Sequence, residues 1–167
     1  MQIISRNQQA PIIVFVNLIA DVDSLHEHLT RAGKRVTLIH GKKSQEQREK
    51  GLNALRDGHA DILVCTNVVA RGIDIENVAH VINYNAPANI TEYIHRIGRT
   101  GRAGKQGLAT TIINMQTDEA LLYDLKKHLI DNDQPIPLEL SHYIAPPERP
   151  QASVSADGSK MITRGLS

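Results

Sequence analysis

Short runs of β-branched and aliphatic residues alternate with amphipathic stretches along most of this chain. The runs have the length of buried strands, and we expect strands at residues 12–16, 36–40, 62–66, 78–84 and 108–113. Between them, apolar residues recur at spacings of three and four, which predicts helices at residues 21–32, 45–56, 90–97 and 118–130. This order of elements predicts an α/β fold, in which a parallel sheet carries helices on both faces. In sheets of this kind, ligands bind beyond the carboxyl ends of the strands.

The ends of the first two helices carry clear signals. Gly33 and Gly58 follow the predicted helices, where glycine is favoured because it readily adopts a positive φ. Ser44 stands before the second helix and Gln47 follows three residues later, which is the spacing of a capping box. The second helix is therefore expected to begin just after Ser44.

Length and composition predict one globular domain followed by a tail. The chain has 167 residues, of which 41% are hydrophobic, and this suffices for one domain with a proper core. From about residue 145 the composition changes to Pro, Ser, Gly and scattered charge. We therefore expect a domain at residues 1–144 and a largely disordered tail at residues 145–167.

Composition also limits the partners. The 19 basic and 18 acidic residues nearly balance, so a surface for nucleic acid has to be a local patch. Only 3% of the residues are aromatic, so any nucleic acid should be held by sugar and phosphate rather than by base stacking. The single cysteine, Cys65, excludes an internal disulfide and suits a reducing compartment. Neither a membrane span nor a signal peptide is visible, so we expect a soluble protein without a membrane partner.

Residues 95–102 have the sequence HRIGRTGR, in which three arginines recur at every third position with glycines between them. The guanidinium group is a planar, permanently charged fork that fits phosphate oxygens. Such a cluster is typical of sites that stabilise charge on a transferring phosphoryl group. We expect the helix to end near Gly98, with Arg99 at its exit, Arg102 in the following loop and both guanidinium groups off the rim of the sheet. The structural alternative is a solvated basic turn.

The sequence lacks the parts that would hold a nucleotide. It contains no phosphate loop of the form Gly-x-x-x-x-Gly-Lys-Ser/Thr. It also has no acidic strand end for magnesium, since Asp61 precedes its strand. The eight histidines show no metal-ligand spacing, and we predict no metal site. The arginine run therefore indicates half of an active site.

A second polar segment, residues 66–74, follows a predicted buried strand. Asp74 is placed to accept hydrogen bonds from sugar hydroxyls, and Thr66 offers its hydroxyl and amide to a phosphate. Alternatively, Asp74 caps a turn and pairs with Arg71 at the surface. The sequence alone leaves both interpretations open.

The third segment is the start of the second helix. A helix N-terminus that follows a glycine, here Gly41, binds phosphate through its free amide groups. Lys42, Lys43 and Arg48 add local positive charge. Taken alone, an ordinary capped helix with solvated charges is the simpler explanation.

At these residues the chain resembles the second RecA-like domain of DEAD-box ATP-dependent RNA helicases, over nearly the whole of residues 12–129. The matching segments are residues 13–17 (fourth motif), 45–48 (the Q-x-x-R element), 66–74 (fifth motif) and 95–102 (sixth motif). The histidine that opens the sixth motif is typical of DEAD-box proteins, whereas Asn67 stands where the fifth motif commonly has Asp. Within the family, several short pieces resemble the spliceosomal member that acts at the 5′ splice site.

The resemblance implies a role for each matching residue. Arg99 and Arg102 are expected to be catalytic arginine fingers that reach the γ-phosphate of ATP. The remaining roles are ATP contacts from Asp74 and Gly72, bonds across the cleft to the first domain from His95, Arg96 and Arg71, and RNA contacts from Arg48, Thr66, Gly41 and Gln45.

The resemblance thus implies the C-terminal half of an ATP-dependent RNA helicase, which acts in local RNA strand separation and, for the spliceosomal subgroup, in pre-mRNA splicing. ATP and Mg²⁺ are the expected cofactors and are held mainly by the N-terminal RecA-like domain, so the chain alone is expected to be inactive. The expected partners are that domain, the RNA backbone and spliceosomal proteins, with a monomer in the nucleus or else the cytoplasm. Two alternatives remain: a non-catalytic RNA- or protein-docking module, and half of a DNA helicase, which His95 disfavours.

Overall fold

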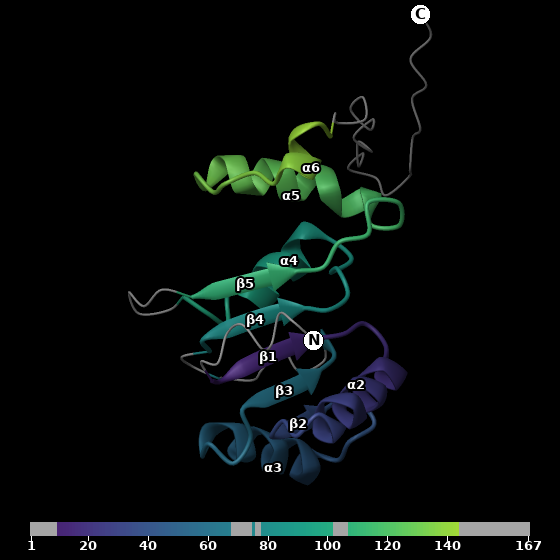
Figure 1. The fold of residues 1–167 in the computed structure, drawn as a ribbon, viewed down its shortest axis with the longest axis vertical. Coiled ribbons are helices and arrows are strands. Elements are labelled where there is room, and N and C mark those ends of the chain that lie inside the picture. Colours follow the sequence, from purple (N-terminus) through teal and green to yellow (C-terminus); the bar gives the residue numbers. More distant parts are fainter. Residues whose placement is uncertain (1–9, 68–74, 76–77, 102–106, 144–167) are drawn as a thin grey trace, which may run out of the picture.

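The structure is a computed structural model that describes residues 10–67, 75, 78–101 and 107–143 (Figure 1). Five short strands form one parallel sheet in the order β2-β3-β1-β4-β5. The strands are β1 (Ile12–Phe15), β2 (Val36–Ile39), β3 (Ile62–Cys65), β4 (His80–Asn83) and β5 (Leu108–Thr111). The helices are α2 (Ile19–Arg31), α3 (Gln45–Arg56), α4 (Ile90–Ile97), α5 (Glu119–Asp131) and α6 (Leu138–Ser141). The expected α/β class with a parallel sheet is confirmed.

Helices cover both faces of the sheet, as the strand order requires. The connection from β1 to β2 crosses the sheet in one direction, whereas those from β2 to β3 and from β4 to β5 cross it in the other. Because such crossovers are right-handed, α2 must lie on one face and α3 and α4 on the opposite face. Accordingly, Val22 of α2 packs in one core cluster with Val14. On the other face, Leu55 of α3 packs in a cluster with Phe15, and Arg96 of α4 lies over the Phe15 ring.

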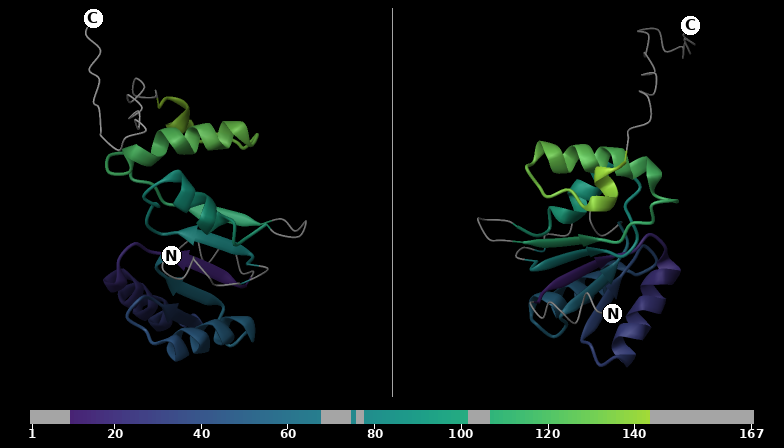
Figure 2. Two further views of the ribbon diagram at one scale, coloured as in Figure 1. Left: turned by 180° about the vertical axis from the view of Figure 1, so that it is seen from behind. Right: turned by 45° about the horizontal axis from the view of Figure 1, so that its top comes forward.

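A third core lies beyond the β4–β5 side of the sheet, where α5 and α6 follow α4 (Figure 2). Leu121, Leu122 and Leu125 of α5 are buried there together with Tyr93 of α4 and Leu140 of α6. Helix α4 therefore has a packing partner on its outer side as well as on the sheet.

The predicted elements are confirmed, with differences at their ends. The observed strands are shorter than the predicted ones. The predictions were too long because buried residues continue past the strand ends: Val16 and Thr66 are buried although β1 and β3 have ended. Helix α2 begins at Ile19, before the predicted residue 21, and its N-cap residue Leu18 makes no side-chain cap bond that would mark the start in the sequence. The short helix α6 was not predicted, since four residues after a proline carry no periodicity.

The predicted helix signals are confirmed at α3. The side chain of Ser44 accepts from the Gln47 N–H, and the side chain of Gln47 accepts from the Ser44 N–H, so both bonds of the capping box form. Gly33 and Gly58 have φ of 74° and 71°.

The predicted tail at residues 145–167 lies outside the described residues. No described helix has the length and apolar character needed to span a bilayer.

The neighbouring strands β1 and β4 form the topological switch point of the sheet. The chain leaves β1 toward β2 on one side and leaves β4 toward β5 on the other. Ligands of open α/β sheets bind in the crevice that such diverging connections leave at the carboxyl ends of the strands. Here that position is flanked by Asn17 after β1 and Asn85 after β4.

Candidate functional site

A buried arginine joins the carboxyl ends of three strands. Asn17 follows β1, Asn67 follows β3 and Asn83 ends β4, and the Arg96 side chain of α4, which is 0% exposed, reaches all three. Its Nε donates to Asn67 Oδ1 (2.7 Å), its Nη1 to Asn83 Oδ1 (3.3 Å) and the Asn85 carbonyl (2.9 Å), and its Nη2 to Asn17 Oδ1 (2.8 Å) and Glu92 Oε1 (2.5 Å). A guanidinium group has five N–H donors, so every one of them has an acceptor within this domain.

The surroundings of Arg96 act on its positive charge in opposite directions. Burial lowers the pKa of Arg96, whereas the Glu92 carboxylate, four residues earlier on α4, raises it. Arginine is not deprotonated in proteins, so the group stays charged. Glu92 also accepts a hydrogen bond from Asn67 Nδ2. The guanidinium lies 5.3 Å from the centroid of the Phe15 ring, in cation–π geometry.

This geometry corrects the expected role of Arg96. The resemblance implied a bond from Arg96 across a cleft to another domain. Instead, the side chain is buried and all of its donors are used by residues of the same sheet and helix. Arg96 is therefore a structural anchor of α4 in this domain.

The same network fills the switch point of the sheet. The Asn17 N–H donates to Asn85 Oδ1 (3.0 Å), and Asn17 Nδ2 donates to the Ala86 carbonyl (2.9 Å), so the ends of β1 and β4 are tied together. Arg96 bonds to both sides of this tie. The place where a ligand is expected in this fold class is thus occupied by the protein's own side chains.

The next arginine of the run is presented differently. Helix α4 ends at Ile97, with Gly98 as its C-cap, and the Arg99 N–H bonds to the Arg96 carbonyl. Arg99 is half-buried and His95 is exposed. The anchored Arg96 and the presented Arg99 are therefore separated by one turn of backbone.

The end of the arginine run lies at the amino edge of the sheet, because α4 runs back along β4. The Thr100 hydroxyl donates to the Val78 carbonyl (2.5 Å), and these two residues also form a parallel β-bridge just before β4. Gly101 has φ of 70°, and a Cβ on Gly107 would lie 2.2 Å from the Gly101 nitrogen. Only glycines allow this close approach. Thr100 therefore lies away from the carboxyl ends of the strands, where the Arg96 side chain is bound.

The predicted RNA-contact residues gather at the carboxyl end of β2 and β3. Ile39 pairs with Cys65 in the ladder, so the chain leaves the two strands side by side toward Gly41 and Thr66. Arg48 of α3 donates from Nη2 to the Gly41 carbonyl (3.3 Å) and from Nε to the Lys43 carbonyl (3.1 Å).

Gln45 and Thr66 differ in exposure and in hydrogen bonding. Gln45 is exposed, and its side chain donates to Glu49 Oε1. Thr66 is only 6% exposed, and its hydroxyl oxygen has no hydrogen-bond partner among the residues that the structure describes. A buried polar atom without a partner is unusual and indicates a ligand or water at that position. Arg71, Gly72, Asp74 and Arg102, also predicted site residues, lie outside the described residues.

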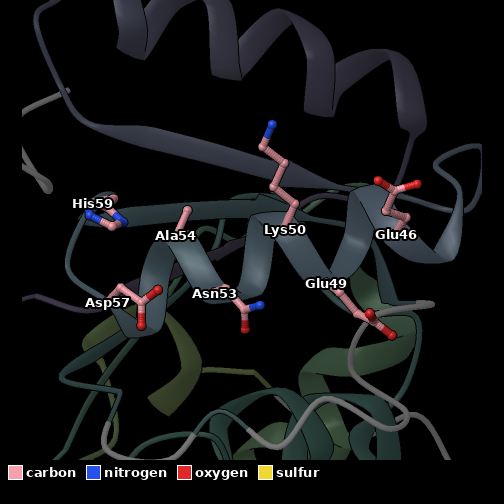
Figure 3. A pocket seen from close by; sticks show the side chains of 7 residues that line it. All are labelled: Glu46, Glu49, Lys50, Asn53, Ala54, Asp57 and His59. Carbon is pink, nitrogen blue, oxygen red and sulfur yellow. The ribbon is translucent and has the colours of Figure 1, made fainter.

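Other reactive groups do not point to a second kind of chemistry. Burial raises the pKa of the Cys65 thiol to about 12, so it stays protonated and unreactive near neutral pH. In the described part of the chain, no group of three or more His, Cys, Asp or Glu residues is arranged to hold a metal ion. A shallow hollow of about 580 Å³ lies on α3, where carboxylates, an amide and Lys50 line it (Figure 3). None of the predicted site residues lines this hollow.

The partners of Arg96 were not predicted from the sequence. Asn83, Asn85 and Glu92 received no role, although two signals were present. An asparagine directly after two aliphatic residues of a predicted strand is unusual, and Asn83 is fully buried. Glu92 precedes Arg96 by four residues, which is the spacing of an ion pair on a helix.

Comparisons with known proteins identify the family. Residues 1–104 match the family model of the helicase conserved C-terminal domain. The chain is 49% identical over 140 residues to DEAD-box ATP-dependent RNA helicase 21 of Oryza sativa subsp. japonica, and this match covers 84% of the chain and 19% of that protein. It is 41% identical over 162 residues to the pre-mRNA-splicing ATP-dependent RNA helicase PRP28 of Gibberella zeae, with 96% of the chain and 22% of that protein covered.

The structural comparison agrees. The fold is similar to the crystal structure of the RNA helicase Prp28 from Chaetomium thermophilum bound to ADP, with a TM-score of 0.77, 42% identity, and coverage of 85% of this chain and 35% of that one. The RecA-like fold and the predicted resemblance to the spliceosomal member are therefore confirmed. The chain spans about a fifth of the length of the two curated relatives. The chain belongs to the family of helicase C-terminal domains, in the DEAD-box group of RNA helicases.

Proposed function

We propose that this chain is the C-terminal half of an ATP-dependent RNA helicase and that it supplies Arg99 and Arg102 to ATP held by the N-terminal domain. The observation that carries the proposal is the position of Arg99 relative to a fixed part of α4. Arg96 is buried and holds the last turn of the helix on the sheet, and the half-buried Arg99 follows three residues later, just past the end of that helix. The Arg96 anchor fixes the backbone from which Arg99 extends, and an arginine finger needs such a preorganised position.

The kinds of side chain found among the described residues fit an ATP site that is shared between two domains. Guanidinium groups suit the charge that develops on a transferring phosphoryl group, but no metal-holding cluster exists among the described residues. Mg²⁺ would therefore be held mainly by the N-terminal domain. When bound, ATP supplies the phosphoryl group that is transferred to water. Asp74 and Gly72 would contact the nucleotide, and His95 and Arg71 would hold the two domains together.

The cluster at the ends of β2 and β3 supports RNA binding through the backbone. Gly41, Arg48 and Thr66 lie at the same end of two paired strands, and the Thr66 hydroxyl is without a partner among the described residues. Gln45 lies at the start of the helix that carries Arg48. Amide, hydroxyl and guanidinium donors of this kind bind phosphate oxygens and do not distinguish bases. Closure of the two domains on ATP and RNA would then bend one strand away from its complement.

The similarity to PRP28 and Prp28 supports a role in pre-mRNA splicing, with spliceosomal proteins as partners and the nucleus as the compartment. The chain itself would act as a monomer beside its own N-terminal domain. Because its contacts are to phosphate and sugar, the choice of RNA would come from those partners and not from this domain.

The 167-residue chain by itself is expected to hydrolyse ATP no faster than buffer with or without RNA. Joined to its N-terminal domain, it should show ATPase activity that rises with added RNA and much less with DNA of the same sequence. Steady-state phosphate release measures both. ATP turnover by the isolated chain at helicase-like rates would contradict the proposal that it holds half of a shared site, and equal stimulation by DNA would favour the DNA-helicase alternative.

Replacement of Arg48 by alanine in the two-domain protein is expected to weaken RNA binding by roughly tenfold or more, because a charge-assisted phosphate contact is lost. The loss should be similar for RNAs of different sequence, and the slope of log affinity against log salt should fall by about one. Fluorescence anisotropy at several salt concentrations measures this. Lys127→Ala removes the same charge from an exposed position on α5 and should leave the affinity unchanged. Wild-type affinity of the Arg48 variant would remove this residue from the RNA site.

A further inference from the structure

Strand β2 has an open edge. Among the residues that the structure describes, it is the first strand of the sheet and pairs with β3 alone. The Ile62 N–H of β3 donates to the Arg35 carbonyl, which fixes the direction of the backbone groups on β2. Because these directions alternate along a strand, the N–H and C=O groups of Val36 and Leu38 point away from β3. Two residues of β2 therefore present a row of donors and acceptors that none of the described strands pairs.

A groove follows this open edge. It has a volume of about 390 Å³ and lies between α2 and α3, with Val36, Thr37 and Leu38 of β2 along it. Ligand pockets in proteins are commonly of this size or larger. Val36 and Leu38 are half-buried against the α2 face of the sheet, so the floor offers apolar surface as well as backbone groups.

The walls of the groove are basic. The groove is lined by His26 of α2, by Lys43 just before α3 and by Lys50 of α3, and by no Asp or Glu. Figure 3 shows Lys50, which lines the groove, extending from one side of α3; Glu46, which does not line it, extends toward the same side, while Glu49 and Asn53 extend from the opposite side. Helix α3 packs closely on β2 at Gly51, where a Cβ would lie 3.1 Å from Thr37 Oγ1. A basic wall thus stands directly beside the open strand edge.

We propose that this groove is a docking site for an extended acidic segment of a partner protein, which adds to the sheet as a strand beside β2. The main chain of the segment would pair with the N–H and C=O groups of Val36 and Leu38. Side chains of a strand alternate in direction, so acidic residues would face Lys43 and Lys50 while apolar residues lie toward Val36 and Leu38. Lys43 also stands in the predicted phosphate-binding segment at the start of α3, but the residues assigned to ATP or RNA contacts take no part, so the inference stands independently of the proposed function.

The test measures hydrogen exchange of single amides in the 167-residue chain by NMR. The probe is a blocked nine-residue peptide in which valine alternates with glutamate, with serine at both ends. At saturation, exchange of the Val36 and Leu38 amides should slow by at least tenfold, whereas the Thr37 and Ile39 amides, already paired with β3, should change little. The same peptide with lysine for glutamate should have no effect.

Variants separate the basic wall from the strand edge. Lys43→Glu combined with Lys50→Glu should abolish the protection, while Lys127→Glu on α5 should retain it. Leu38→Pro removes an edge N–H and is tolerated by strands only on an open edge. If that variant does not fold, the charge variants still decide the question. Three results would overturn the inference: unprotected Val36 and Leu38 amides in excess peptide, equal protection by the lysine peptide, or amides already protected in the free chain because another of its segments covers the edge.

Discussion

Replacement of Arg99 by alanine in the full-length protein is expected to lower RNA-stimulated ATP hydrolysis by roughly a thousandfold or more. The reason is that an arginine finger stabilises charge that exists only in the transition state, so its loss falls on kcat and much less on KM for ATP. RNA affinity should stay near that of the wild type, since the RNA-contact cluster lies at the other end of the sheet. Single-turnover kinetics at saturating ATP and RNA measure the chemical step directly.

Two variants make this result specific. Arg99→Lys keeps the charge but loses the planar fork, and most of the activity should still be lost. Arg31→Ala removes an exposed arginine of α2 and should leave the rate unchanged. Full activity of Arg99→Ala, in a sample that melts like the wild type, would instead favour a docking module that has retained the RecA-like fold.

Replacement of Arg96 by methionine is expected to lower the free energy of unfolding of this chain by about 3–5 kcal/mol. The substitution leaves the Glu92 carboxylate without its cation and strands the oxygen atoms of Asn17, Asn67 and Asn83 in or near the core. Buried acceptors that have lost their donors retain the cost of desolvation. Urea unfolding followed by circular dichroism, with an unchanged m-value, measures the loss.

The chain contains a matched control for this prediction. Arg31 and Glu27 on α2 form an ion pair with the same spacing and the same 2.5 Å distance as Arg96 and Glu92, but both side chains are mostly exposed. Arg31→Met should therefore change stability by no more than about 0.5 kcal/mol. Arg96→Lys should fall between the two, because an ammonium group supplies three donors where five acceptors wait. Equal, small effects at both sites would mean that the buried network contributes little.

Much of the fold could be predicted because its signals are local. The apolar runs predicted all five strands, and the capping box at Ser44 and the glycines after α2 and α3 placed helix ends within a residue or two. Short, buried strands and glycines with positive φ leave the same pattern in any sequence of this class. The start of α2 lacked such a signal, and it was predicted two residues late.

The roles inside the arginine run could not be predicted because they depend on contacts distant in sequence. Arg96 and Arg99 look alike in a three-residue repeat, and only the sheet order brings Asn17 within 2.8 Å of Arg96, 79 residues away. Which arginine is buried is decided by β1, β3 and β4 meeting at one edge, and the direction of α4 then carries Arg99 to the opposite edge. Neither fact is visible before the topology is known.

The filled crevice between β1 and β4 limits where this domain can bind a ligand. Asparagine and arginine side chains fill the crevice at this switch point. A small molecule would therefore have to bind at another surface of the domain. Under the proposed function, each ATP turnover would then depend on the meeting of two domains.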